Sequence, residues 1–171
     1  MVAYDPRWPG SYSEEQQRLT PVLAPWLTRP IEHVGSTSVP GLVAKPIIDM
    51  VAVVADIESF DGAVPALGAV GWVSAPEPLD AVNREMSFCT PSVQRRTHHL
   101  HVVEEASSSW REWIAFRDYL RVRPELAVEY GALKTRLAAE HGGDPNERDA
   151  YRAGKAAWIR AVTDDALRER T

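Results

Sequence analysis

The chain has 171 residues, of which 44% are hydrophobic and 25% charged. These are ordinary values for a globular protein and exclude a disordered or fibrous chain. The length suits one domain with its own core, so we expect a single domain over residues 1–171. The net charge of −5 argues against binding long nucleic acids through phosphate neutralisation, and small-molecule or nucleotide substrates fit better.

The expected location follows from two absences in the sequence. No apolar run approaches the roughly 20 residues of a membrane-spanning helix, and the first ten residues lack the pattern of a signal peptide. The one cysteine, Cys89, cannot form an intrachain disulfide, which agrees with a reducing compartment. We therefore expect a cytoplasmic protein with no membrane partner, and the oligomeric state stays open.

The first two-thirds of the chain predicts a sheet with interspersed helices. Apolar side chains at helical spacing predict a first helix that begins near Ser13 and is ended by Pro25, and Ser13 with Gln16 forms a candidate capping box. A further helix is predicted over residues 57–70, and a hairpin connection at residues 91–92. Runs of β-branched and aromatic residues predict strands at residues 31–34, 47–54, 72–73, 85–90 and 97–103.

The last third has helical spacing throughout. Ser107 or Ser109 can cap a helix that runs to about residue 122, and Pro124 can open a second helix as its first residue. Gly142-Gly143 separates this second helix from a third over residues 146–167. The fold class is therefore α+β: a mixed sheet of about four to six strands with a C-terminal helical hairpin or bundle.

A short polar bend and a lone acid stand out between residues 31 and 54. Asp49 interrupts an apolar run, and an ionised carboxylate there is costly unless a cation or donors compensate it. The bend Gly35-Ser36-Thr37 offers backbone N–H groups and hydroxyls that suit a close anion. Together they indicate a phosphate site facing a metal-binding acid. The alternative is a plain turn whose hydroxyls cap a helix.

These residues also carry a resemblance to a known family. Gly35-Ser36, twelve intervening residues and Asp49 resemble the hydrophobic-Gly-[Gly/Ser] and Asp-hydrophobic-[Asp/Glu] signature of the nucleotidyltransferase superfamily, and EHVGSTSVPGLVAKPIIDM is similar to its GrpB family. The similarity continues through YDPRWPGSY, HHLHVVE, FRDYLRVRPELAVEYGALKTRLA and AYRAGKAAWI. It implies a polymerase-β-like nucleotidyltransferase fold. Related domains fused to dephospho-coenzyme A kinases suggest a nucleotide-related role.

The resemblance implies a divalent metal, which in nucleotidyl transfer neutralises the triphosphate and orients the attacking hydroxyl. Asp49 is the expected first ligand, but the position of the superfamily's second acid is Val51, which cannot bind a metal. His99 and His101 share one face of a predicted strand, with His98 on the other, and are the candidate replacements. We expect Asp49 and His101 to be catalytic and the metal to be magnesium or manganese, with zinc a further candidate. Alternatively, the histidines bond to neighbouring carbonyls.

Two tyrosine–lysine pairs, Tyr130 with Lys134 and Tyr151 with Lys155, indicate a polyphosphate site. In each pair the residues stand four apart, so they share one face of a predicted helix. The tyrosines can instead lie in the core while the lysines reach out to solvent. The candidate nucleotide- or phosphate-binding residues are Gly35, Ser36, Thr37, Lys45, Arg84, Lys134, Tyr151 and Lys155, with Tyr130 and Arg117 as further candidates.

Three functions remain open from the sequence. The first is a metal-dependent nucleotidyltransferase that moves a nucleotidyl group from a nucleoside triphosphate to a small-molecule acceptor. The second is a non-catalytic nucleotide-binding module, favoured by Val51 at the second acid position. The third is an accessory or interaction protein on the same fold, because a fold does not determine an activity.

Overall fold

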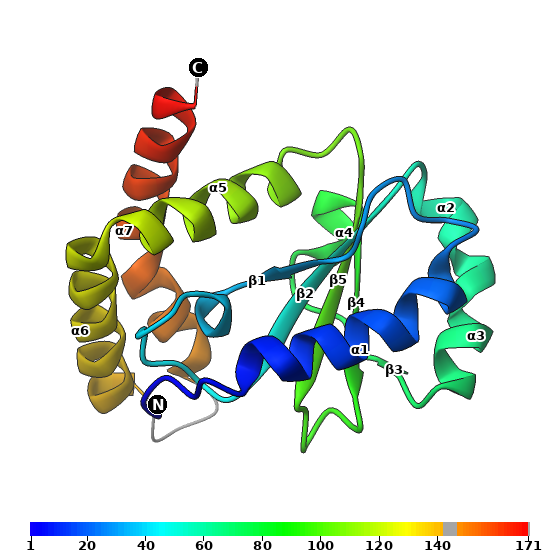
Figure 1. The fold of residues 1–171 in the computed structure, drawn as a ribbon, viewed down its shortest axis with the longest axis horizontal. Coiled ribbons are helices and arrows are strands. Elements are labelled where there is room, and N and C mark those ends of the chain that lie inside the picture. The colour runs from blue at the N-terminus through cyan, green and yellow to red at the C-terminus, as the bar shows by residue number, and fades with distance from the viewer. Residues whose placement is uncertain (142–146, 171) are drawn as a thin grey trace.

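A five-stranded mixed sheet lies at the centre of the molecule (Figure 1). The computed structural model describes residues 1–141 and 147–170. The strand order is β1-β2-β5-β4-β3, in which only β2 and β5 are parallel neighbours. The strands are β1 (Glu32–Val34), β2 (Ile48–Val54), β3 (Val73–Ser74), β4 (Glu85–Thr90) and β5 (His98–Glu104). The predicted strands and the predicted α+β class are confirmed.

One face of the sheet packs against the helices of the first half. Helix α1 (Trp8–Leu23) runs across this face, and α2 (Ile57–Phe60) and α3 (Val64–Ala69) follow β2 (Figure 1). Met50 of β2 and Leu100 of β5 belong to the core cluster on this side, which also contains Leu19 and Leu23 of α1. Alternate residues of β2 therefore point away from this core, toward the opposite face.

The opposite face is covered by α5 (Ser109–Val122). Trp110, Trp113 and Ile114 of α5 pack against a buried cluster of strand valines that includes Val51 and Val53. Because both faces of β2 are covered, the strand reads as a nearly continuous apolar run. Asp49 near its start is the exception.

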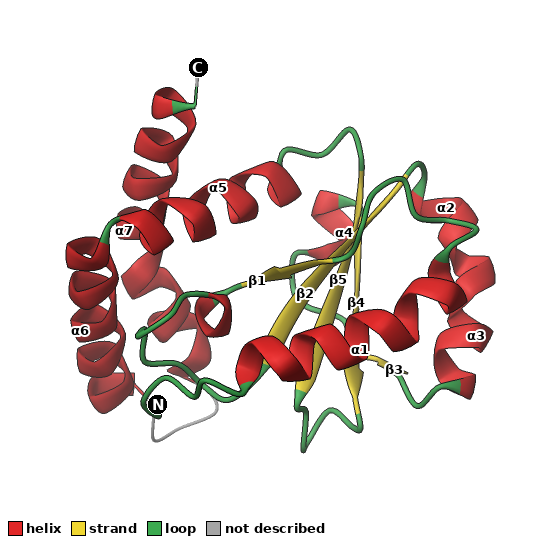
Figure 2. Ribbon diagram, in the orientation of Figure 1, coloured by secondary structure: helices red, strands yellow, loops and turns green. Residues whose placement is uncertain are grey.

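The last two helices pair beside the β1 edge of the sheet. Helices α6 (Pro124–His141) and α7 (Arg148–Glu169) form the C-terminal hairpin predicted from the sequence (Figure 2). Their cluster with α5 includes Val39 and Leu42, which follow the bend after β1. This packing joins the C-terminal helices to the bend. Among the described residues, no helix combines the length and apolar character needed to cross a membrane.

Several predicted details are wrong. Helix α1 begins at Trp8, and the capping box does not form, because Ser13 donates to the Pro9 carbonyl and Gln16 to that of Ile31. The helix predicted over residues 57–70 is broken by a 3-10 turn ahead of α3. A short helix, α4 (Asp80–Asn83), was not predicted. The predicted Gly142-Gly143 separator lies outside the described residues.

Arg117 has a structural role rather than the phosphate-binding role considered for it. It is 7% exposed, and its Nη1 donates to Glu32 Oε2 at 2.7 Å and to the His33 carbonyl at 2.8 Å. Its Nε donates to Asp118 Oδ1 at 2.7 Å. These bonds attach α5 to β1, the strand that leads into the bend.

We predict that Arg117→Met lowers the free energy of unfolding by about 2–3 kcal/mol, because several charge-assisted hydrogen bonds are lost at a buried site. Urea denaturation measures this change. Arg136→Met is the matched control, since Arg136 is mostly exposed and reaches Glu140 only at 4.0 Å. Equal stabilities of the two variants would contradict a role for Arg117 in joining α5 to β1.

Candidate functional site

The carboxylate of Asp49 lies directly against Gly35. Val34 pairs with Asp49 in the register of β1 and β2, so the bend begins beside the acid. A Cβ placed on Gly35 would lie 2.5 Å from Asp49 Oδ2, and Gly35 has φ +69°. Both the contact and the left-handed backbone require glycine here. The predicted juxtaposition of bend and acid is therefore present, and the Asp49 side chain remains 32% exposed.

His99 and His101 stand beside Asp49 on the same face of the sheet. In the parallel pairing of β2 and β5, Asp49 is opposite His99 and Val51 is opposite His101. The ring centroids of the two histidines are 4.2 Å apart, and His99 Nδ1 lies 3.6 Å from Asp49 Oδ1. One ligand atom from each of the three residues lies within 4.8 Å of the others. One oxygen and two imidazole nitrogens could thus hold a single divalent cation.

Burial keeps His101 in the neutral form that can bind a metal ion. Burial of its ring, reinforced by the neighbouring His99, lowers the pKa of His101 to about 4 against a weaker opposing effect of Asp49. His101 is therefore neutral at pH 7, the form in which an imidazole binds a metal. The position at which the resembled signature has its second acid is occupied by Val51, which is fully buried under the tryptophans of α5 and cannot bind a metal.

Lys134 reaches the bend from α6. It is 2% exposed, and its Nζ donates to Ser36 Oγ at 2.8 Å and to the Val43 carbonyl at 2.6 Å. Burial, followed by the like charge of Lys155, lowers the pKa of Lys134 to about 7, while Asp49 opposes the shift. The ammonium also lies 4.6 Å from the centre of the Tyr130 ring. The alternative in which this lysine points into solvent is wrong.

Lys45 and Lys155 meet at Tyr151. Each Nζ lies 5.2 Å from the centre of the Tyr151 ring, so the loop before β2 and helix α7 present their ammonium groups together. Burial lowers the pKa of Lys155, and the charges of Lys45 and Arg152 lower it further against the effect of Asp49. Repulsion between these cations indicates a site that an anion would stabilise.

All the lysines of the chain gather here. The sequence has 16 arginines but only three lysines, Lys45, Lys134 and Lys155. Within residues 1–141 and 147–170, no carboxylate lies within 4.0 Å of their ammonium groups, whereas many of the arginines are ion-paired. An ammonium group is a compact point charge well suited to phosphate. The cluster is therefore a cationic surface next to the acid.

Two predicted phosphate ligands, Thr37 and Arg84, lie away from the lysine cluster or face the interior. Thr37 is 1% exposed, and its hydroxyl bonds to the Ile47 carbonyl and to His33, so it faces the interior. Arg84 pairs with Glu104 at 2.8 Å. Glu104 is five residues beyond His99 in β5, roughly 16 Å along the strand. Arg84 therefore belongs to the opposite end of the sheet.

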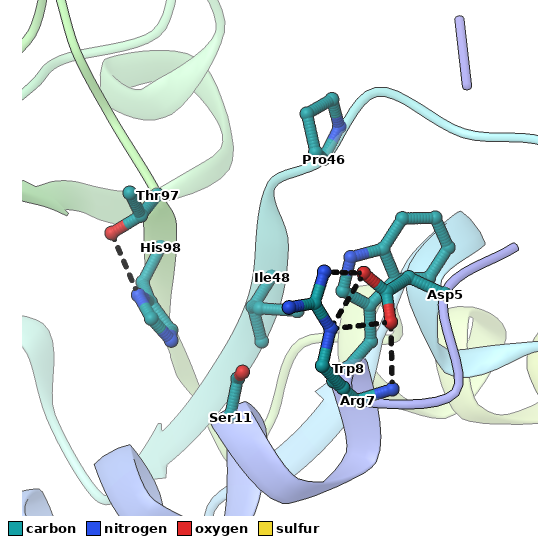
Figure 3. Close-up of a pocket in the computed structure, with 8 residues that line it drawn as sticks. All are labelled: Asp5, Arg7, Trp8, Ser11, Pro46, Ile48, Thr97 and His98. Atoms are coloured by element: carbon teal, nitrogen blue, oxygen red, sulfur yellow. Dashed lines mark hydrogen bonds and ion pairs between the residues drawn. The ribbon is translucent and has the colours of Figure 1, made fainter. Parts of the chain in front are cut away.

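His98 points to the other face, as strand alternation predicts. It lines a shallow hollow beside the start of α1, where its Nδ1 lies 2.9 Å from the Thr97 hydroxyl (Figure 3). Arg7 of the same hollow is engaged by Asp5 through several hydrogen bonds (Figure 3). Neither residue contributes to the Asp49 site.

Sequence reasoning missed Glu77, which lies beside His99, and the two arginines that pair with Glu77. Glu77, from the segment between β3 and α4, lies 4.0 Å from His99 Nε2 and is ion-paired with Arg96 and Arg152. Glu77 stands in an irregular segment between two prolines, so no periodic pattern indicates its direction. The sequence held a weak indication that Arg152 lies near the site, because Arg152 directly follows Tyr151 on a helix with predicted phosphate-binding residues.

Comparisons with known proteins find similar chains. A family model described as GrpB protein matches residues 1–165. The UPF0157 protein YqkA of Bacillus subtilis (strain 168) is 36% identical over 168 residues, which cover 98% of this chain and 47% of YqkA. A UPF0157 protein of Streptomyces coelicolor is 36% identical over 160 residues, which cover 93% of this chain and 79% of that protein. This chain thus spans about half the length of YqkA.

A solved structure shares the whole fold. The crystal structure of the conserved protein GrpB from Enterococcus faecalis has a TM-score of 0.85 and 32% sequence identity, and the match covers 99% of this chain and 98% of that one. A more distant relative, named dephospho-CoA kinase, from Mycolicibacterium paratuberculosis, is 26% identical over 182 residues that cover 94% of this chain and 44% of that protein.

We predict that Gly35→Ala lowers the free energy of unfolding by about 3 kcal/mol, through left-handed backbone strain together with the contact against Asp49. Gly41→Ala is the matched control, since Gly41 has φ +78° and no atom within 4 Å of an added Cβ. It should cost only about 1–2 kcal/mol. In an Asp49→Gly background the penalty for Gly35→Ala should fall to the level of the control. If Gly35→Ala and Gly41→Ala cost the same free energy of unfolding while Asp49 is intact, the carboxylate does not press on the bend.

Proposed function

Because the chain belongs to the GrpB family and gathers its lysines around an Asp–His–His cluster, we propose that it is a metal-dependent nucleotidyltransferase. In this proposal it moves a nucleotidyl group from a nucleoside triphosphate to the hydroxyl of a small-molecule acceptor. The carrying observation is the convergence of three lysines, none held by a described carboxylate, beside three candidate metal ligands. A cationic surface adjoining a metal-binding cluster suits a metal–triphosphate complex.

Each group has a distinct part in the proposal. Asp49, His99 and His101 hold a divalent cation, which supplies charge neutralisation at the reacting phosphate. A cluster with two imidazoles favours manganese or zinc over magnesium. Lys45 and Lys155 bind the outer phosphates. Lys134 acts on the phosphates indirectly, because its ammonium group holds Ser36 of the bend. The backbone at Gly35 and Ser36 contacts the phosphates.

The reaction is an in-line displacement at the α-phosphorus. The acceptor oxygen forms a bond to phosphorus while the bond to the bridging oxygen breaks, and pyrophosphate leaves. The acceptor hydroxyl loses its proton to solvent. The ammonium groups of Lys45 and Lys155 neutralise the charge that develops on pyrophosphate, which is the main catalytic requirement in phosphoryl chemistry.

A second candidate is a nucleotide-binding module without turnover. The observation that favours it is the burial of Val51, which leaves a single carboxylate where the superfamily signature has two. The name of the distant relative, dephospho-CoA kinase, fits either candidate, because both concern nucleotides. Turnover distinguishes the two.

The test is calorimetric binding of nucleoside triphosphates to the full chain with manganese, zinc or magnesium, followed by an assay of pyrophosphate release with a panel of hydroxyl acceptors. We predict manganese-dependent binding that weakens about 10- to 100-fold in Lys155→Met and loses its metal dependence in Asp49→Asn, because each change removes a charge-assisted contact. Pyrophosphate release should disappear in Asp49→Asn.

Arg160→Met provides the control, because it removes one positive charge from an exposed position on the same helix as Lys155. Its nucleotide affinity should equal that of the wild type. Binding without pyrophosphate release from any acceptor would favour the module. Binding of no triphosphate with any of the three metals would rule out both candidates.

We also predict that anion binding takes up a proton near Lys134. With its pKa lowered to about 7, Lys134 is mostly neutral at pH 8, and a bound phosphate favours the ammonium form and raises that pKa. Calorimetry of tripolyphosphate binding at pH 8, without metal and in buffers of different ionisation enthalpy, measures the proton number. We expect uptake of up to one proton in the wild type and a smaller value in Lys134→Met. Equal proton numbers in the two proteins would contradict the placement of phosphate beside the bend that Lys134 holds.

A further inference from the structure

One nitrogen of the candidate metal cluster has an unexplained environment. His99 is 6% exposed, and its Nε2 is buried with no hydrogen-bond partner. A buried polar atom without a partner is costly, so such atoms usually mark a ligand or a partner slightly out of reach. The other nitrogen, Nδ1, faces Asp49 at 3.6 Å. The ring therefore lies between the Asp49 carboxylate and whatever faces Nε2.

The group that faces Nε2 is Glu77. Its Oε1 lies 4.0 Å from Nε2, about 1 Å beyond hydrogen-bond distance. The Glu77 backbone N–H donates to Asp80 Oδ2 at 2.9 Å, and Asp80 also accepts from Ser87, which stands opposite His101 in β4. The backbone of Glu77 is thus anchored next to β4 and β5, on a separate segment of the chain from His99.

The Glu77 carboxylate is also held in place by two arginines. Arg152 of α7 pairs with Oε2. Arg96 Nη1 donates to Oε1 at 3.3 Å. A fixed carboxylate beside a buried imidazole nitrogen favours the tautomer that carries its proton on that nitrogen, against the opposite preference of Asp49 beside Nδ1.

We propose that Glu77 is a positioning residue that accepts a hydrogen bond from Nε2–H of His99 and thereby directs the Nδ1 lone pair toward the cation held with Asp49 and His101. The carboxylate–histidine–metal arrangement recurs at metal sites, where the outer carboxylate fixes the ring and raises its basicity. Here Glu77 compensates in part for the carboxylate missing at Val51. The metal part of the inference rests on the proposed function, whereas the tautomer does not.

Glu77 further links the two halves of the site. Arg152 of α7 pairs with Glu77, and its neighbour Tyr151 lies against Lys45 and Lys155. The segment that orients the metal-binding histidine is therefore attached to the helix that presents the phosphate-binding lysines. Polyphosphate binding on α7 and metal binding at His99 should consequently strengthen each other.

The test combines two measurements on the full chain at pH 8. Long-range ¹H–¹⁵N correlation spectra of the metal-free protein report the tautomer of His99, and calorimetric titration with zinc or manganese reports metal affinity. We expect the Nε2–H tautomer in the wild type and a shift toward Nδ1–H in Glu77→Met, with metal affinity about 10- to 100-fold weaker. Glu77→Gln keeps an acceptor oxygen and should retain the wild-type tautomer and most of the affinity.

Glu105→Met is the matched control, because it also removes an arginine-paired glutamate, which pairs with Arg29 just beyond the far end of β5. Its tautomer and metal affinity should match the wild type. An Nδ1–H tautomer in the wild-type protein would overturn the inference even if Glu77→Met failed to fold. Folded Glu77→Met with unchanged tautomer and affinity would also overturn it. The expected tautomer shift without metal binding would confirm the hydrogen bond and count against the proposed function alone.

Discussion

The close approach of the Asp49 carboxylate to Gly35 is the contact on which the rest of the site depends. It requires a residue without a side chain at a left-handed position, directly after a short edge strand paired with β2. Because the bend is fixed against the acid, Ser36 is in reach of Lys134 from α6. The parallel pairing of β2 with β5 then places His99 on the other side of Asp49. The backbone geometry at Gly35 thus brings together groups from the bend, β2, β5 and α6.

The electrostatics of the site follow from its composition. The chain uses arginine at sites of structural ion pairing, as with Arg117 between α5 and β1. It uses lysine only where three ammonium groups lie together without a described acid to neutralise them. Burial and mutual repulsion lower the pKa of Lys134 and Lys155. Such a cluster stores electrostatic free energy that a bound anion would release.

The sequence predicted the sheet, the C-terminal helices and the pairing of bend and acid, because each depends on local signals: β-branched runs, Pro124 as a first helical residue, and Gly35 beside an isolated Asp49. It could not place Arg84, whose position depends on how the segment before β4 packs, or reveal that the Thr37 hydroxyl turns inward. Glu77 was missed because tertiary packing alone brings that irregular segment to His99.

The most direct test of the central claim is a crystal structure of the protein with manganese and a non-hydrolysable nucleoside triphosphate, using anomalous scattering to locate the ion. The arrangement predicts manganese about 2.0–2.3 Å from an Asp49 oxygen and from nitrogens of His99 and His101, with the phosphates against Lys45 and Lys155. An ion bound elsewhere, or phosphates that lie away from these lysines, would contradict it.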